Sequence, residues 1–61
     1  MKLGDYLHFN KITCESMRKQ LGIGANYLRT IKRGEAVPSL ELAERIEILT
    51  GGEVTVKELR G

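Results

Sequence analysis

Two arginines four residues apart, Arg29 and Arg33, are the side chains best suited to chemistry with an anion. On a helix they would share one face, because residues four apart are neighbours there. A guanidinium group presents a planar fork of N–H donors that matches guanine or a phosphate group with two hydrogen bonds. Each arginine can therefore bind guanine or hold a phosphate. The simpler alternative is a basic face that is covered only by water.

Other reactive side chains are scarce in the 61 residues, where Cys14 is the only cysteine and His8 the only histidine. A disulfide within the chain is excluded, and so is a standard structural zinc site, which needs four ligands. Cys14 has no base near it in the sequence, and Gly22-Ile23-Gly24 is better explained as a turn than as a phosphate-binding loop. We therefore expect neither catalysis nor a metal or other cofactor.

Charge is unevenly distributed along the chain, whose net charge is +2. Residues 1–38 carry seven basic and three acidic side chains, whereas residues 39–61 carry three basic and five acidic ones. This division favours an anionic partner at one end of the molecule, and random scatter over a small surface is the alternative. No apolar run approaches the roughly 20 residues of a membrane span, and the N-terminus lacks the apolar stretch of a signal peptide. We expect a cytoplasmic protein without a membrane partner.

The elements that must position these side chains begin with two short helices. A first helix is expected over residues 2–9, where apolar side chains follow helical spacing at Leu3, Tyr6 and Leu7. Thr13 is a suitable N-cap for a second helix, and Gly22 can take the left-handed conformation that ends it. The link to the next helix is then very tight.

A third helix is expected from Ala25 to Arg33 with Gly34 as its stop, and a fourth from its cap Ser39 to about Thr50. The fourth helix is more apolar than a single buried face requires. Either both of its apolar stripes serve the core, or part of this surface contacts a second copy. In the second case we expect dimer contacts from this helix and the tail after it: Leu42, Ile48, Leu49, Val54 and Val56.

The last residues give weaker signals. Residues 53–56 can be extended, and Thr55 with Glu58 has the spacing of a capping box for a short final turn. The chain contains no repeat and no linker. The sequence therefore predicts an all-α fold, a compact bundle of four to five short helices in a single domain over residues 1–61.

An ordered set of short motifs runs from Ile12 to Leu40: Ile12-Thr13, Leu21-Gly22-Ile23, Tyr27-Leu28 with Ile31, Arg33-Gly34 and Pro38-Ser39-Leu40. This set resembles the helix-turn-helix core of the Cro and phage-repressor family, also called the xenobiotic-response-element type. The resemblance covers nearly all of the chain after Lys11. It implies a lambda-repressor-like DNA-binding domain with a helix-turn-helix motif over about residues 13–33.

The resemblance also implies that Ala25–Arg33 is the recognition helix, which lies in the major groove of double-stranded DNA. With Leu28 and Ile31 facing inward, base contacts are expected from the outward residues Asn26, Arg29, Thr30 and Arg33. An asparagine can pair with adenine, and a threonine methyl group can meet thymine. Phosphate contacts, which add affinity but no sequence information, are expected from Lys11, Thr13, Tyr27 and Lys32. For Tyr27 the alternative is packing on the helix edge.

Two residues depart from the family pattern. Cys14 stands where the family usually has a glutamine that bonds a phosphate, and a thiol is a weak donor. We interpret Cys14 as a passive, partly buried thiol, with a redox switch as the alternative. Arg18 stands where the family usually has alanine, between the two motif helices. Its side chain must run outward along its methylene stem or open the angle between the helices.

The function expected from this resemblance is sequence-specific regulation of transcription, as a repressor of bacterial or phage type that is associated with the nucleoid. One 61-residue domain covers little DNA, which favours a homodimer. The alternative is a protein-interaction module on the same fold, an antitoxin or anti-repressor subunit with weak or absent DNA binding. The departures at Cys14 and Arg18 support this alternative.

Overall fold

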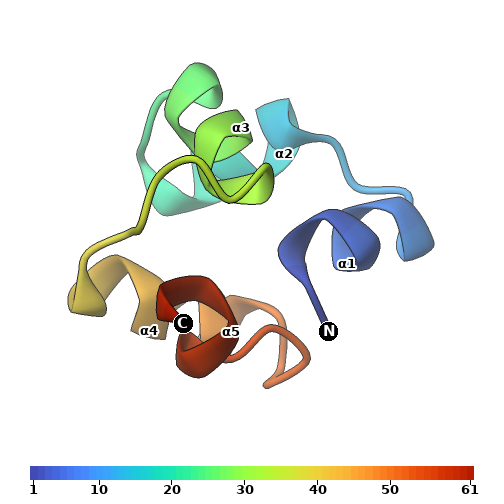
Figure 1. The fold of residues 1–61 in the computed structure, drawn as a ribbon. Coiled ribbons are helices and arrows are strands. Elements are labelled where there is room, and N and C mark those ends of the chain that lie inside the picture. Colours follow the sequence, from blue (N-terminus) through green and yellow to red (C-terminus); the bar gives the residue numbers. More distant parts are fainter.

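The computed structural model describes residues 1–61 as five short helices without a strand, which confirms the predicted all-α fold. The helices are α1 (Leu3–Phe9), α2 (Cys14–Leu21), α3 (Ala25–Lys32), α4 (Leu40–Leu49) and α5 (Val56–Arg60). Helices α2 and α3 lie together on one side of the molecule, and α4 and α5 lie together on the other (Figure 1). The Cα atoms extend over 23 × 21 × 18 Å.

Side-chain hydroxyl groups begin three of the helices. The hydroxyls of Thr13 and Ser39 accept the backbone N–H three residues further on, at 3.1 and 3.2 Å, and so cap α2 and α4. At α5, Thr55 and Glu58 form both halves of the predicted capping box. These bonds satisfy N–H groups that have no partner inside a helix. All three caps agree with the sequence-based expectation.

Four helices end in a common way, with a residue in the left-handed conformation whose successor donates its N–H to the carbonyl five residues back. Glycine occupies this position after α2, α3 and α4, as Gly22 (φ 72°), Gly34 (φ 78°) and Gly51 (φ 64°). After α1 the position is held by Lys11 (φ 56°), the only residue other than glycine with a positive φ. The turn after α1 is therefore made at a conformational cost that the other three avoid.

One core holds the helices together. It consists of nine buried apolar residues: Leu3, Leu7, Met17, Leu21, Leu28, Ile31, Leu42, Ile46 and Val54. Thr50 is the one polar residue buried with them, and its hydroxyl donates to the Ile46 carbonyl at 2.9 Å. The same hydroxyl accepts the N–H of Val54 at 3.1 Å, so that the end of α4 is tied to the segment before α5.

Two expectations for the C-terminal half are wrong. Leu42 and Val54, two of the candidate contacts with a second copy, are 8% and 0% exposed and belong to the core, as the alternative prediction had it. The segment 53–56 is not an extended strand either, since it bends at Glu53 and Val54 and enters α5 at Val56. The physical reason is that Val54 must point into the core immediately before the capping box turns the chain into a helix.

The N-terminus and helix α4 both make polar contacts with α5 or the segment before it. The Met1 ammonium group lies 2.7 Å from a Glu58 carboxylate oxygen and donates to the Glu53 carbonyl at 2.7 Å. The Glu47 carboxylate accepts the N–H of Val56 at 2.8 Å. None of the helices has the length and apolar character that a bilayer crossing requires.

Candidate functional site

The four predicted base-reading residues lie on one face of α3. Leu28 (0% exposed) and Ile31 (5% exposed) turn the opposite face into the core. Successive helical residues are rotated by about 100°, so the four side chains fall within an arc of about 100° centred opposite the core. They are Asn26, Arg29, Thr30 and Arg33, of which Thr30 is half-buried and the others are exposed.

Each of these side chains already makes a local polar contact. Arg29 Nη1 donates to Asn26 Oδ1 at 2.9 Å, and Thr30 Oγ1 donates to the Tyr27 carbonyl at 2.6 Å. Arg33 Nε lies 3.1 Å from a carboxylate oxygen of Glu35, with both side chains more than half exposed. Exposed pairs of this kind stabilise a fold by little. Their effect is to orient the side chains before any ligand arrives.

Of the predicted phosphate-binding residues, Tyr27 and Lys32 flank this face on α3 itself. Lys11 and Thr13 lie in the link between α1 and α2, and Thr13 keeps its hydroxyl hydrogen free because the oxygen acts as acceptor in the cap. Tyr27 is 41% exposed, which leaves its ring edge in water. The stem of Lys32 lies against α1, where a methyl group added to Gly4 would come within 3.3 Å of Lys32 Cγ.

Arg18 does not wedge between α2 and α3. Its guanidinium group bends back along α2 and forms an ion pair with Glu15, one turn earlier on the same helix. This hydrogen bond lowers the pKa of the Glu15 carboxyl and raises the pKa of Arg18, with smaller contributions to Glu15 from the charges of Lys19 and Arg29. The outward path of Arg18 was one of the two predicted solutions. Glu15 itself was missed, although its position three residues before Arg18 is the usual spacing of a helical ion pair.

Cys14 is half-buried and packs against the core as a free thiol. No three side chains of the types that bind metal ions lie together in the structure. Besides Cys14, the first turn of α2 carries the polar side chains of Glu15 and Ser16, and the Thr13 hydroxyl caps it.

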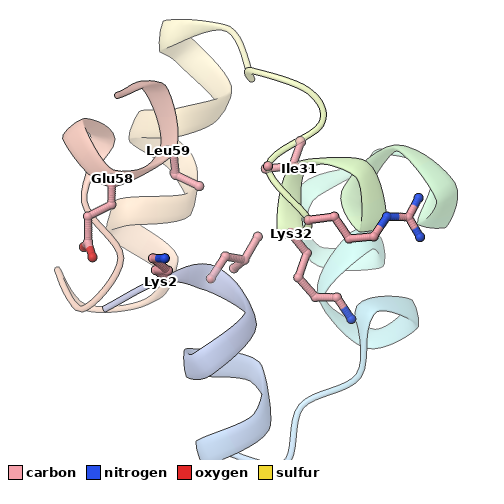
Figure 2. A pocket seen from close by; sticks show the side chains of 8 residues that line it. Lys2, Ile31, Lys32, Glu58 and Leu59 are labelled. Carbon is pink, nitrogen blue, oxygen red and sulfur yellow. The ribbon is translucent and has the colours of Figure 1, made fainter.

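A recess of about 230 Å³ lies where α1, α3 and α5 meet. Figure 2 shows that Ile31 and Leu59 point into it from α3 and α5, whereas the ammonium group of Lys32 points away. The recess is thus lined by both apolar and charged side chains, where α3 meets α1 and α5.

The outer face of α4 also exposes apolar side chains. Ile48 is 80% exposed and Leu49 is 37% exposed, and both line a shallow groove of about 240 Å³ between α2 and α4. Gln20, Leu21 and Arg45 complete the groove. Of the five predicted dimer contacts, Ile48 and Leu49 are therefore at the surface, and Val56 is half-buried.

Comparison of the chain with protein-family models, with curated proteins and with solved structures gives no match.

Proposed function

We propose that the protein is a sequence-specific DNA-binding regulator that reads the major groove with α3. The observation that carries this proposal is the outer face of α3, where an amide, a hydroxyl and two guanidinium groups gather opposite the buried side. Side chains of these types supply most direct contacts to base edges, and an α-helix fits the major groove. The helices α2 and α3, joined by Gly22–Gly24 and packed on each other, would act as a helix-turn-helix unit.

Charge supports the same surface. Four bases lie on α3 or in the link before α2, namely Lys11, Arg29, Lys32 and Arg33. The helices α4 and α5 carry more acidic than basic residues and lie on the other side of the molecule (Figure 1). A DNA duplex would therefore approach from the α3 side. Occupation of a promoter by the protein blocks other proteins, so repression is the simplest regulatory outcome.

A homodimer follows from the dimensions. The half-sites of a palindromic operator lie about 34 Å apart, whereas one copy extends over at most 23 Å. Each α3 would then lie about 17 Å from the two-fold axis, which is most of the width of one copy. The dimer surface must accordingly lie on the side of the molecule away from α3.

The outer face of α4 meets this requirement (Figure 1). Ile48 is its most exposed apolar residue, and Glu44 and Arg45 flank it at the surface. In an antiparallel pair of α4 helices with its two-fold axis beside Ile48, the Ile48 side chains of the two copies would contact each other. The face thus offers an apolar side chain that is flanked by one acidic and one basic residue.

DNA binding is tested by selection of duplexes from a random pool at low salt, followed by affinity measurements on the selected sequence. We expect a two-fold symmetric consensus with half-sites about one helical turn apart. The variant Arg29→Ala,Arg33→Ala should lose the sequence preference, whereas Lys57→Ala, which removes a cation from α5, should keep it. The absence of any DNA binding at low salt would refute the proposal.

The dimer is tested by analytical ultracentrifugation of Ile48→Glu. The matched control is Phe9→Glu, since Phe9 is another exposed apolar residue, at 75%, but lies on α1. We expect Ile48→Glu to be monomeric and Phe9→Glu to remain a dimer. A monomeric wild-type protein that binds DNA poorly and forms a stoichiometric complex with another protein would instead support the interaction module.

A further inference from the structure

The hydrogen bond between Arg29 and Asn26 limits what each side chain can read. Arg29 Nη1 donates to Asn26 Oδ1 at 2.9 Å, one helical turn apart on the outer face of α3. Adenine recognition by asparagine uses both ends of the amide, because Nδ2 donates to N7 while Oδ1 accepts from the N6 amino group. In this structure the Oδ1 end is already occupied.

The second lone pair of Oδ1 does not remove this conflict. A carbonyl oxygen can accept two hydrogen bonds. An adenine amino group that approached the same oxygen would, however, place its donor hydrogens beside the cationic guanidinium group of Arg29. Two donors at one acceptor repel each other, and Arg29 has the stronger interaction because a charged donor forms the stronger bond. Asn26 is therefore better matched to Arg29 than to adenine.

Arg29 keeps the donors that it needs for a base. A guanidinium group has five N–H donors, of which the bond to Asn26 uses one. The remaining donors still include a pair that fits the O6 and N7 acceptors of guanine. Because the bond to Asn26 restricts the orientation of a long side chain, less conformational entropy is lost when guanine binds.

We propose that Arg29 is the guanine-reading residue of α3 and that Asn26 is a positioning residue that holds Arg29, without reading adenine itself. This inference rests on the DNA-binding function proposed above. Instead of one base contact from each of Asn26 and Arg29, it assigns a single base contact to Arg29 and a supporting hydrogen bond to Asn26. It also assigns one G·C base pair of each half-site to the first turn and a half of α3.

The test uses two substitutions that divide the amide of Asn26 into its parts. Asn26→Ala removes both donor and acceptor. Asn26→Asp keeps an acceptor for Arg29 but removes the N–H donor that adenine N7 would need. Sequence preference is measured for each variant by selection and by the affinities of duplexes in which one base pair is replaced. Circular dichroism confirms the fold, which these exposed positions should leave unchanged.

We expect Arg29→Ala to reduce the preference for guanine at one position by roughly 5- to 150-fold, the range of one good bidentate contact. Asn26→Ala should weaken the preference at that same position, and Asn26→Asp should restore it. The added negative charge of Asn26→Asp should lower affinity for all sequences equally, because it repels phosphates wherever the protein binds.

The positioning role would be overturned if Asn26→Ala and Asn26→Asp both lost the sequence preference at a separate A·T position and kept the preference for guanine. The proposed DNA binding would then remain in place. A wild-type protein that selects no sequence at all would overturn the proposed function and this inference together. The two failures are distinguished by the wild-type selection alone.

Discussion

The left-handed backbone of Lys11 gives a prediction in which stability and DNA binding change in opposite directions. Lys11 has φ 56°, whereas glycine holds the equivalent position after α2, α3 and α4. The left-handed conformation destabilises the folded state by roughly 1–2 kcal/mol when the residue has a Cβ. Glycine avoids this cost, but it lowers stability by about 0.4–1 kcal/mol because it has greater conformational freedom in the unfolded chain. Lys11→Gly should therefore raise the free energy of unfolding by about 1 kcal/mol, or the melting temperature by roughly 4–8 °C.

The same substitution removes a proposed phosphate contact. The plot of log affinity against log salt concentration should become shallower by about 0.9, the value for one phosphate contact on B-DNA. Thermal unfolding followed by circular dichroism measures the first effect, and fluorescence anisotropy at several salt concentrations measures the second.

Lys11→Ala is the matched control, because alanine removes the charge but keeps the conformational cost. It should reproduce the loss of salt dependence with little change in melting temperature, as is usual for an exposed position. The reasoning is refuted if Lys11→Gly lowers the melting temperature, or if the glycine and alanine variants are equally stable.

Three further substitutions test other parts of the structure. Glu15→Gln should free Arg18 to contact a phosphate, so that DNA binding tightens at low salt and its salt dependence steepens by about 0.9; an unchanged slope would show that Arg18 stays away from DNA. The pKa of Glu58 is lowered chiefly by its hydrogen bond to the terminal ammonium group. The contribution of this carboxylate to the stability of the fold is therefore complete above the ordinary carboxyl pKa and is lost as pH falls through the lowered value. Glu58→Gln should therefore flatten the acid side of the stability profile measured by urea unfolding, and a profile as steep as that of the wild type would contradict this assignment. Thr50→Val keeps the shape of a buried side chain but leaves the N–H of Val54 without its partner, and should cost about 1–3 kcal/mol in the same unfolding assay, whereas a neutral result would show that water replaces the hydroxyl.

Local chemistry made most of the fold predictable from the sequence. Thr13 and Ser39 are caps because their hydroxyl groups reach N–H groups three residues away, and this needs no information about distant residues. Gly22 and Gly34 end helices because they adopt positive φ without steric cost. The outward face of α3 was predictable for the same reason, since Leu28 and Ile31 fix its inward side through spacing alone.

The remaining features depend on contacts that spacing does not encode. The fourth helix has two apolar stripes, and only the positions of α2 and α5 decide that Leu42 is buried while Ile48 is exposed. Val54 was placed at an interface because its role in the core depends on a hydrogen bond from its N–H back to Thr50. Residue type alone also does not show that Arg29 donates a hydrogen bond to the side-chain oxygen of Asn26.

The division of α3 into two faces explains how so short a chain can hold both a core and a polar outer face. A domain of about 60 residues buries only about 60% of the surface of its unfolded chain, so it has little capacity to bury a polar group without a partner. The inward face of α3 accordingly uses apolar residues alone, and Asn26, Arg29, Thr30 and Arg33 each find a partner within one turn or in the adjacent link. Arg18 follows the same principle on α2, where its charge stays near water beside Glu15. Because Asn26, Arg29, Thr30 and Arg33 are not part of the core, we expect substitutions on this face to alter the proposed base contacts while the fold is retained.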